Sequence, residues 1–203
     1  MENKNKKQLI DFEKRIEKLW EDKKIPTPIH LSGGNEDQLI KIFKKINEDD
    51  YVFSTHRSYY HYLLKGGKEE VLEQKILSGE SMSVIDKSLK FYSSSIVAGT
   101  PAIATGVAWA LDRKGVKNRV YCFIGDAAAM DEGHSYEAIK YSCCNDLPIT
   151  FVIEDNDRSV KTSIEDRWNS KKEYLIKDRK HILHYKYKPT WPHVGNGHHI
   201  QFT

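Results

Sequence analysis

Two oxygen-bearing side chains, those of Asp126 and Asn156, stand where apolar stretches of the sequence end, after residues 120–124 and 149–153. Magnesium takes six oxygen ligands in octahedral geometry and usually shares them among carboxylates, phosphates and water. Each residue alone is better explained as a helix cap or a turn former. As a pair at the ends of two strands of one unit, they favour a magnesium site that holds a diphosphate.

The residues between them predict a strand, a turn, a helix and a second strand, which together form one βαβ unit. A helical stretch from about Glu132 to Cys144 follows the small residues 127–129, and Pro148 precedes the second apolar run. Because a right-handed crossover makes the two strands parallel, their carboxyl ends meet at one edge of the sheet, where open α/β sheets bind ligands. A helix that begins at Ala127-Ala128 would direct free amide groups toward a diphosphate.

The sequence around this unit resembles a known family. The stretch GDAAAMDEGHSYEA, followed by LPITFVIEDN, is similar to the alpha subunit of the dehydrogenase component of 2-oxoacid dehydrogenase complexes, a group that includes the pyruvate, branched-chain and acetoin enzymes. Gly125-Asp126 through Asn156 resembles the thiamine diphosphate motif, usually GDG, an intervening segment and NN. The similarity extends from about Ile25 to Trp168. It implies an α/β thiamine diphosphate-binding fold, with a parallel sheet, helices on both faces, and thiamine diphosphate and Mg²⁺ as cofactors.

The resemblance implies a role for each matching residue. The metal would be held by the side chains of Asp126 and Asn156 and by the carbonyl of Arg158. Arg57 would hold the diphosphate, a task that suits a planar guanidinium. The cofactor-binding residues would be His56, Arg57, Ser95, Val97, Gly125, Asp126, Ala127, Ala128 and Asn156.

Two histidines are predicted to be catalytic through the same resemblance. His30 belongs to a segment similar to HL-x-x-GQEA, where the family's histidine lies near the reactive thiazolium. His61 matches the second histidine of an HRGHGH-like loop, predicted here over residues 55–62 after a strand at 51–54. A loop histidine such as His30 is otherwise a polar surface residue, and the aromatic residues around His61 are otherwise packing residues.

Several positions depart from the family pattern, among them Tyr59, Tyr60, Ala127 and Ser95. Tyr59 and Tyr60 replace His and Gly, which puts the pocket wall in doubt there. Ala127 replaces a glycine, and its Cβ is unfavourable if the backbone must approach phosphate or adopt positive φ. Ser95 also replaces a glycine and is compatible with the site only if its backbone angles are ordinary.

The resemblance also implies a partner. In the family, a glutamate of the beta subunit activates the aminopyrimidine, and no stretch of this chain resembles that subunit. We therefore expect a beta-like partner that carries the activating Glu, in an alpha2beta2 heterotetramer. The small-residue helix that begins at Pro101 would lie at the subunit contact or pack within one monomer. The chain ends before the family's HGHS-type loop, which supplies a further active-site histidine.

The function implied is that of the diphosphate- and magnesium-binding subunit of a thiamine enzyme. The family reaction is oxidative decarboxylation of a 2-oxo acid with acyl transfer, and it is the favoured interpretation. A split transketolase-like enzyme, which would act on a ketose or aldehyde, is an alternative. A non-catalytic scaffold subunit is another, and the departures at Ala127, Tyr59 and Tyr60 support it.

Composition narrows the class of protein. At 203 residues we expect a single domain over 1–203, with an N-terminal helix at 8–23 and a C-terminal tail at 181–203. A net charge of +3 gives no reason to expect nucleic acid or a membrane as partner. The three cysteines lack disulfide or zinc spacing and fit the cytoplasm. No apolar run approaches the ~20 residues that span a bilayer.

The end of this tail, residues 189–203, contains three histidines, His193, His198 and His199. A metal site is conceivable there, but no acidic or cysteine residue stands at a suitable spacing. Residues 181–188 have strand character. For residues 189–203 we expect a terminal segment that pairs with a sheet edge or with a partner.

Overall fold

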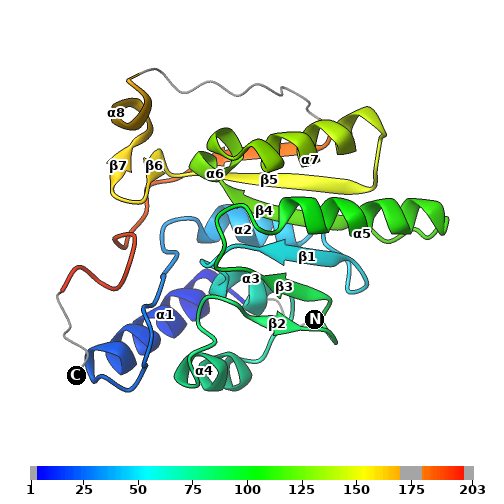
Figure 1. Cartoon of the computed structure of the whole chain (residues 1–203). Helices are drawn as coiled ribbons and strands as arrows, with labels where there is room; N and C mark the ends of the chain where they lie inside the picture. The colour runs from blue at the N-terminus through cyan, green and yellow to red at the C-terminus, as the bar shows by residue number, and fades with distance from the viewer. Residues whose placement is uncertain (1–3, 170–179, 199–203) are drawn as a thin grey trace.

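The computed structural model describes residues 4–169 and 180–198, and it is built around a six-stranded sheet in the order β2-β3-β1-β4-β5-β8 (Figure 1). Neighbouring strands are parallel except for the pair β2 and β3. The prediction of an α/β fold with a parallel sheet is confirmed. The strands of this sheet are β1 (Tyr51–Ser54), β2 (Ile85–Asp86), β3 (Phe91–Ser93), β4 (Val120–Gly125), β5 (Ile149–Asp155) and β8 (Ile182–Lys186), and β6 (Arg158–Ser159) and β7 (Thr162–Ser163) form a separate ribbon.

Helices cover both faces of the sheet, as predicted. Successive residues of β4 point to opposite faces, so that Tyr121 and Phe123 enter one apolar core while Val120 and Cys122 enter the other. The first core includes α1 to α4 and the second includes α5 and α7. None of the described helices is long and apolar enough to cross a bilayer. The helices are α1 (Lys6–Glu21), α2 (Glu36–Phe43), α3 (Tyr59–Leu64), α4 (Glu69–Leu77), α5 (Pro101–Arg113), α6 (Asp126–Asp131), α7 (Gly133–Cys144) and α8 (Ile164–Trp168).

The central βαβ unit is present, with β4 and β5 parallel and Gly125 paired with Glu154. The predicted single helix is divided into α6 and α7, because Glu132 has an extended backbone with ψ of 113°. Strand β5 continues two residues further than predicted, to Asp155, since β8 pairs with its other edge. The strand character predicted for residues 181–188 is thus confirmed by β8, whereas residues 189–198 of the terminal segment form no strand. Residues 199–203 of the tail, with His199, lie outside the described residues.

The prediction of a loop over residues 55–62 is wrong for its second half, which forms α3. The reason is burial of every side chain of this short helix. Tyr59 and Tyr60 are 0% and 1% exposed, and the hydroxyl of Tyr59 is hydrogen-bonded to Ser81. The aromatic residues thus form core rather than a pocket wall.

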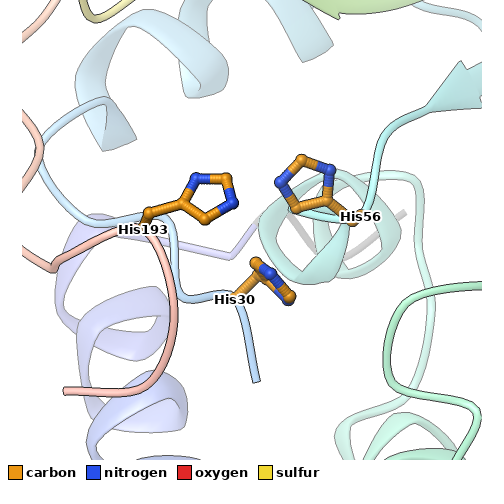
Figure 2. Close-up of side chains that lie close together, drawn as sticks. All are labelled: His30, His56 and His193. Carbon is orange, nitrogen blue, oxygen red and sulfur yellow. The ribbon is translucent and has the colours of Figure 1, made fainter. Parts of the chain in front are cut away.

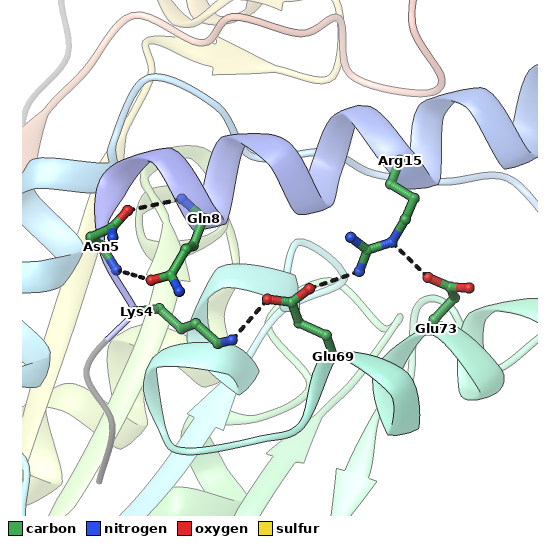
Figure 3. Close-up of polar contacts among 6 residues, drawn as sticks. All are labelled: Lys4, Asn5, Gln8, Arg15, Glu69 and Glu73. Carbon is green, nitrogen blue, oxygen red and sulfur yellow. Dashed lines mark hydrogen bonds and ion pairs between the residues drawn. The ribbon is translucent and has the colours of Figure 1, made fainter.

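Helix α1 begins two residues before its predicted start because Asn5 and Gln8 form a capping box (Figure 3). Figure 3 also shows the ion pairs that attach this helix to α4. Arg15 contacts Glu69 and Glu73, each at 2.8 Å, and Lys4 contacts Glu69 at 2.8 Å. Because these groups are partly exposed, each pair contributes less than about 1 kcal/mol. The apolar face of α1, rather than its charges, holds it in place.

The residues after β8 return to the N-terminal part of the chain (Figure 1). This C-terminal segment (residues 188–198) makes two main-chain hydrogen bonds there, from Thr190 to Gly33 and from Gly195 to Ile29. The indole of Trp191 donates to Glu13, a fully buried residue of α1. The segment therefore closes over the loop that carries His30.

We expect Gly34→Ala to lower the free energy of unfolding by at least about 2 kcal/mol. Gly34 has φ of +95°, and an added Cβ would lie 2.2 Å from the carbonyl oxygen of Lys188. The matched control is Gly106→Ala in α5, where no atom lies within 4 Å of the added Cβ. This variant should be about 0.5–1 kcal/mol more stable than wild type. Urea unfolding measures both, and equal stabilities would contradict the tight contact at Gly34.

Candidate functional site

A cavity of about 240 Å³ lies at the carboxyl ends of the parallel strands. This is the edge at which sequence reasoning placed a ligand. The cavity is lined by residues that follow four different strands, so residues distant in sequence meet there. They include Thr55, His56 and Arg57 after β1, Ile96, Val97 and Ala98 after β3, Gly125, Asp126, Ala127 and Ala128 around the end of β4, and Asn156 and Arg158 after β5.

The acidic cluster (Asp126, Asp155 and Asp157) lies on one side of this edge. One carboxylate oxygen from each residue lies within 4.8 Å of the other two. Asp126 and Asp155 are each 1% exposed. His184 contacts Asp155 at 2.9 Å, and the amide of Asp157 donates to the same carboxylate at 3.1 Å. A group of three carboxylates, two of them buried and the third exposed, suits a divalent cation such as magnesium.

Asn156 and Asp126 line the same cavity, as does Arg158. The side-chain oxygen of Asn156 accepts a hydrogen bond from the amide of Arg158 at 3.0 Å, which orders the chain after β5. Tyr187 is hydrogen-bonded to Asn156 as well, and its pKa is raised by burial and by Glu154. The predicted metal ligands therefore surround one cavity, and their role stays a prediction.

The histidine cluster (His30, His56 and His193) lies at the same edge, and its three rings face one another in Figure 2. The ring centroids of His30 lie 4.6 Å from His56 and 5.3 Å from His193. Burial, reinforced by the charge of Arg57, lowers the pKa of His30 to about 4. Burial and the neighbouring histidines and Arg57 lower the pKa of His56 to about 3. Among the described residues, His30 Nδ1 and His56 Nε2 are buried without a hydrogen-bond partner.

Arg57 lines the cavity, and its guanidinium is hydrogen-bonded to two other segments of the chain. One guanidinium nitrogen donates to the carbonyl of Leu31 at 2.6 Å. The other donates to the carbonyl of His193 at 3.1 Å and lies 3.2 Å from Nδ1 of the same residue. The guanidinium is thus positioned by fixed acceptors, which is the condition for binding a phosphate group with a defined geometry.

Neither predicted catalytic histidine lines the cavity. His30 contacts it through His56, which does line it. His61 is 1% exposed, lies against the ring of Phe123, and is hydrogen-bonded to Ser54 at 2.7 Å and Glu154 at 3.2 Å. Its contact with the cavity runs through Glu154, so the geometry gives His61 the role of orienting that carboxylate.

Two of the residues that depart from the family pattern, Ala127 and Ser95, have no unusual backbone angle. Ala127 and Ser95 are absent from the described non-glycine residues with positive φ, so a Cβ at either position causes no backbone strain of that kind. Ser95 is exposed and does not line the cavity, whereas Val97 does. Positive φ occurs instead at Ala98, Asp157 and Val160, all close to the site. Strain of this kind concentrates at functional sites.

Sequence reasoning missed several residues of this site. Asp155 and Asp157 flank Asn156, and the acidic run EDND was the signal that could have identified them. His193 and Tyr187 also line the cavity. They come from the chain after β8, and the sequence contains no local pattern that predicts their return to residues 55–57.

Comparison with known proteins gives consistent matches. The family model described as "Dehydrogenase E1 component" matches residues 4–179. The pyruvate dehydrogenase E1 component subunit alpha of Rickettsia prowazekii (strain Madrid E) is 29% identical over 163 residues, which cover 75% of this chain and 50% of the relative.

The acetoin:2,6-dichlorophenolindophenol oxidoreductase subunits alpha are also similar. The protein of Cupriavidus necator is 30% identical over 164 residues, covering 75% of this chain and 49% of the relative. The protein of Bacillus subtilis (strain 168) is 28% identical over 165 residues, covering 76% and 49%. The chain spans about half the length of the curated relatives it matches.

We expect the free energy of unfolding to fall as the pH is lowered from 6.5 toward 4. The folded-state pKa values of His30 and His56 lie below the ordinary 6.5, so the unfolded chain binds more protons in that range. Their contribution is complete above pH 6.5 and is lost as the pH falls. Urea unfolding at several pH values measures the slope.

The variant with both His30→Asn and His56→Asn should show a smaller slope, and His198→Asn, which changes an exposed residue, should retain it. Ring titration of the wild-type histidines by NMR is a second measurement that does not depend on a variant. Ordinary pKa values for both rings would contradict their burial as neutral groups.

Proposed function

The chain belongs to the dehydrogenase E1 component family, and on this premise we propose that it binds the diphosphate and the magnesium ion in a heteromeric thiamine diphosphate-dependent enzyme. The observation that carries the proposal is that Arg57 and Asp126 line one cavity at the carboxyl ends of the strands, with the carboxylates of Asp155 and Asp157 close to that of Asp126. A cation and an anion can be held together there. A magnesium diphosphate has both.

The residues present fit this group. Asp126, Asn156 and the carbonyl of Arg158 would hold the metal, and all three residues line the cavity. Asp155 and Asp157 add negative charge beside these residues, and this charge favours the binding of a divalent cation. Arg57 would bind the phosphates, and Gly125, Ala127 and Ala128 border the same space. There is open space beside Gly125, because no atom lies within 4 Å of the position that an added Cβ would take.

The chain's own residues would bind and orient the cofactor. Thiamine diphosphate, when bound, supplies the electron sink that stabilises a carbanion. Arg57 holds the phosphate end at a fixed position, and the metal ligands neutralise its charge. His56 is neutral at physiological pH and can donate or accept a hydrogen bond in the cavity. Val97 would contact the aminopyrimidine ring through its main chain, as the family resemblance implies.

A beta-like subunit would complete the site. Ile96 and Val97 line the cavity yet are 71% and 58% exposed, so the apolar side of the cavity is open in this chain. Ile103 and Trp109 of α5 are exposed as well, at 59% and 45%. Apolar surface of this kind marks an interaction site. The matched relatives are named as alpha subunits, which supports a beta-like partner that brings the activating glutamate.

The favoured reaction is dehydrogenation of a 2-oxo acid or of acetoin. The matched relatives support this reaction, because one group of them is named for pyruvate dehydrogenase and the other for acetoin oxidoreductase. Carbon–carbon bond transfer of the transketolase kind is the alternative. The scaffold alternative loses its main support, because Tyr59 and Tyr60 lie in the core and Ala127 has no positive φ.

We expect thiamine diphosphate to bind only in the presence of Mg²⁺, with the affinity reduced at least about 10-fold by Asp126→Asn or Asn156→Ala. Asp126→Asn removes the negative charge of one metal ligand, and Asn156→Ala removes an oxygen ligand. Titration calorimetry measures the affinity of each variant. Asp112→Asn, which changes an exposed carboxylate of α5, is the control and should bind as wild type does. Unchanged affinity in the two site variants would remove the metal assignment.

We expect the chain, purified with a beta-like subunit, to reduce 2,6-dichlorophenolindophenol when pyruvate or acetoin is supplied together with thiamine diphosphate and Mg²⁺. The chain alone should be inactive because the activating glutamate comes from the partner. Product analysis by NMR distinguishes the alternative reaction. Ketol or aldehyde transfer without dye reduction would favour the transketolase-like enzyme.

A further inference from the structure

His193 is the one member of the histidine cluster that comes from the C-terminal segment. It lies 136 positions after Arg57 in the sequence, and yet it contacts the guanidinium through both its ring and its carbonyl. Both residues line the cavity. The proposed function gives Arg57 a task but gives none to His193.

The C-terminal segment is held firmly enough to place this side chain. Its main-chain bonds from Thr190 to Gly33 and from Gly195 to Ile29, at 3.1 and 2.9 Å, lie on either side of His193. Gly195 packs against the indole of Trp20, and an added Cβ would lie 2.5 Å from that ring. The position of His193 is therefore fixed by contacts on both sides of it.

The contact with Arg57 fixes the tautomer of His193. A guanidinium only donates hydrogen bonds, so Nδ1 of His193 must be the accepting nitrogen. In the neutral ring, Nε2 then carries the proton. Nε2 is thereby a donor.

A metal ion held by the three histidines is a competing explanation. One ring nitrogen from each lies within 4.8 Å of the other two, a spacing that could close around a cation. However, the only lone pair of the neutral His193 ring already accepts from Arg57, and the positive guanidinium beside it repels a cation. Only His30 and His56 would remain as ligands, which is fewer than the three protein ligands of a catalytic zinc site.

We propose that His193 is a positioning residue that holds Arg57 for the phosphate end of the cofactor, so that the C-terminal segment forms part of the cofactor site. This rests on the proposed function, in which Arg57 binds the diphosphate. A long arginine side chain loses rotational freedom when it binds a ligand. Because His193 and Leu31 hold it beforehand, less freedom is lost on binding and the affinity is higher.

The experiment is a double-mutant cycle on binding of thiamine diphosphate and Mg²⁺, measured by titration calorimetry. His193→Ala should weaken binding about 10-fold, the effect of losing one charge-assisted hydrogen bond. His193→Gln should restore most of the affinity because its amide oxygen can accept from Arg57. In an Arg57→Gln background, His193→Ala should have no further effect. His198→Ala, which changes an exposed histidine of the same segment, is the matched control.

The outcomes separate this proposal from a general loss of structure. If His193→Ala weakens binding equally in both backgrounds, or if Gln gives no recovery, the residue does not act through Arg57 and the proposal is overturned. Binding of Zn²⁺ to the wild-type chain that is lost in His193→Ala would also overturn it, in favour of the metal explanation. Urea unfolding of each variant shows whether the fold is retained.

A measurement without cofactor distinguishes failure of this proposal from failure of the proposed function. Ring ¹⁵N shifts of His193 should show an unprotonated Nδ1 and a protonated Nε2. Burial, together with Arg57 and Lys161, lowers the pKa of this ring, so Arg57→Gln should raise it toward 6.5. If the wild-type chain binds no thiamine diphosphate but the ring behaves in this way, only the proposed function fails. If the ring has the opposite tautomer, the positioning role fails.

Discussion

The parallel register of β4 and β5 determines where the acidic groups of the site lie. Pairing of Gly125 with Glu154 brings Asp126 beside the residues that follow β5, and the acidic cluster forms as a direct result. Carboxylates that are buried this close repel one another and lose hydration, so an isolated cluster of this kind destabilises a fold. The backbone ladder supplies the compensating stability, and a bound cation would relieve the repulsion. The stability of the sheet therefore offsets the repulsion among the carboxylates of the site.

The cavity is electrically asymmetric. Arg57 and Asp126 both line it, two further carboxylates lie close to Asp126, and neutral imidazoles lie beside the arginine. Neutral rings can fill the space next to a guanidinium without adding a second positive charge. A ligand that carries both a metal ion and phosphate groups matches this distribution better than a simple anion or a simple cation does. The open apolar side at Ile96 and Val97 leaves room for the rest of such a ligand and for a second polypeptide.

Much of the fold followed from local patterns in the sequence, and the parts that did not have physical causes. The apolar runs before Asp126 and Asn156 identified the central unit, and the family resemblance is confirmed. Helix α3 was missed because its aromatic residues were assigned to a loop by analogy, although their burial favours a helix. The acidic residues Asp155 and Asp157 were passed over in favour of Asn156, since only the latter matched the motif. The single domain over 1–203 and the individual site roles stay predictions. His193 could not be predicted, because a contact over 136 positions depends on tertiary structure alone.

The return of the C-terminal segment to α1 has a consequence for folding. Its contacts with Glu13 and Glu17 join residues that are 178 and 179 positions apart, among the most distant pairs that the described chain can form. Loop closure over such separations is slow, and these contacts cannot form until residue 198 has left the ribosome. The sheet can assemble earlier, from segments synthesised before it. A nascent chain would thus form most of its sheet before Arg57 gains the contact with His193, and until then it would bind the proposed ligand more weakly.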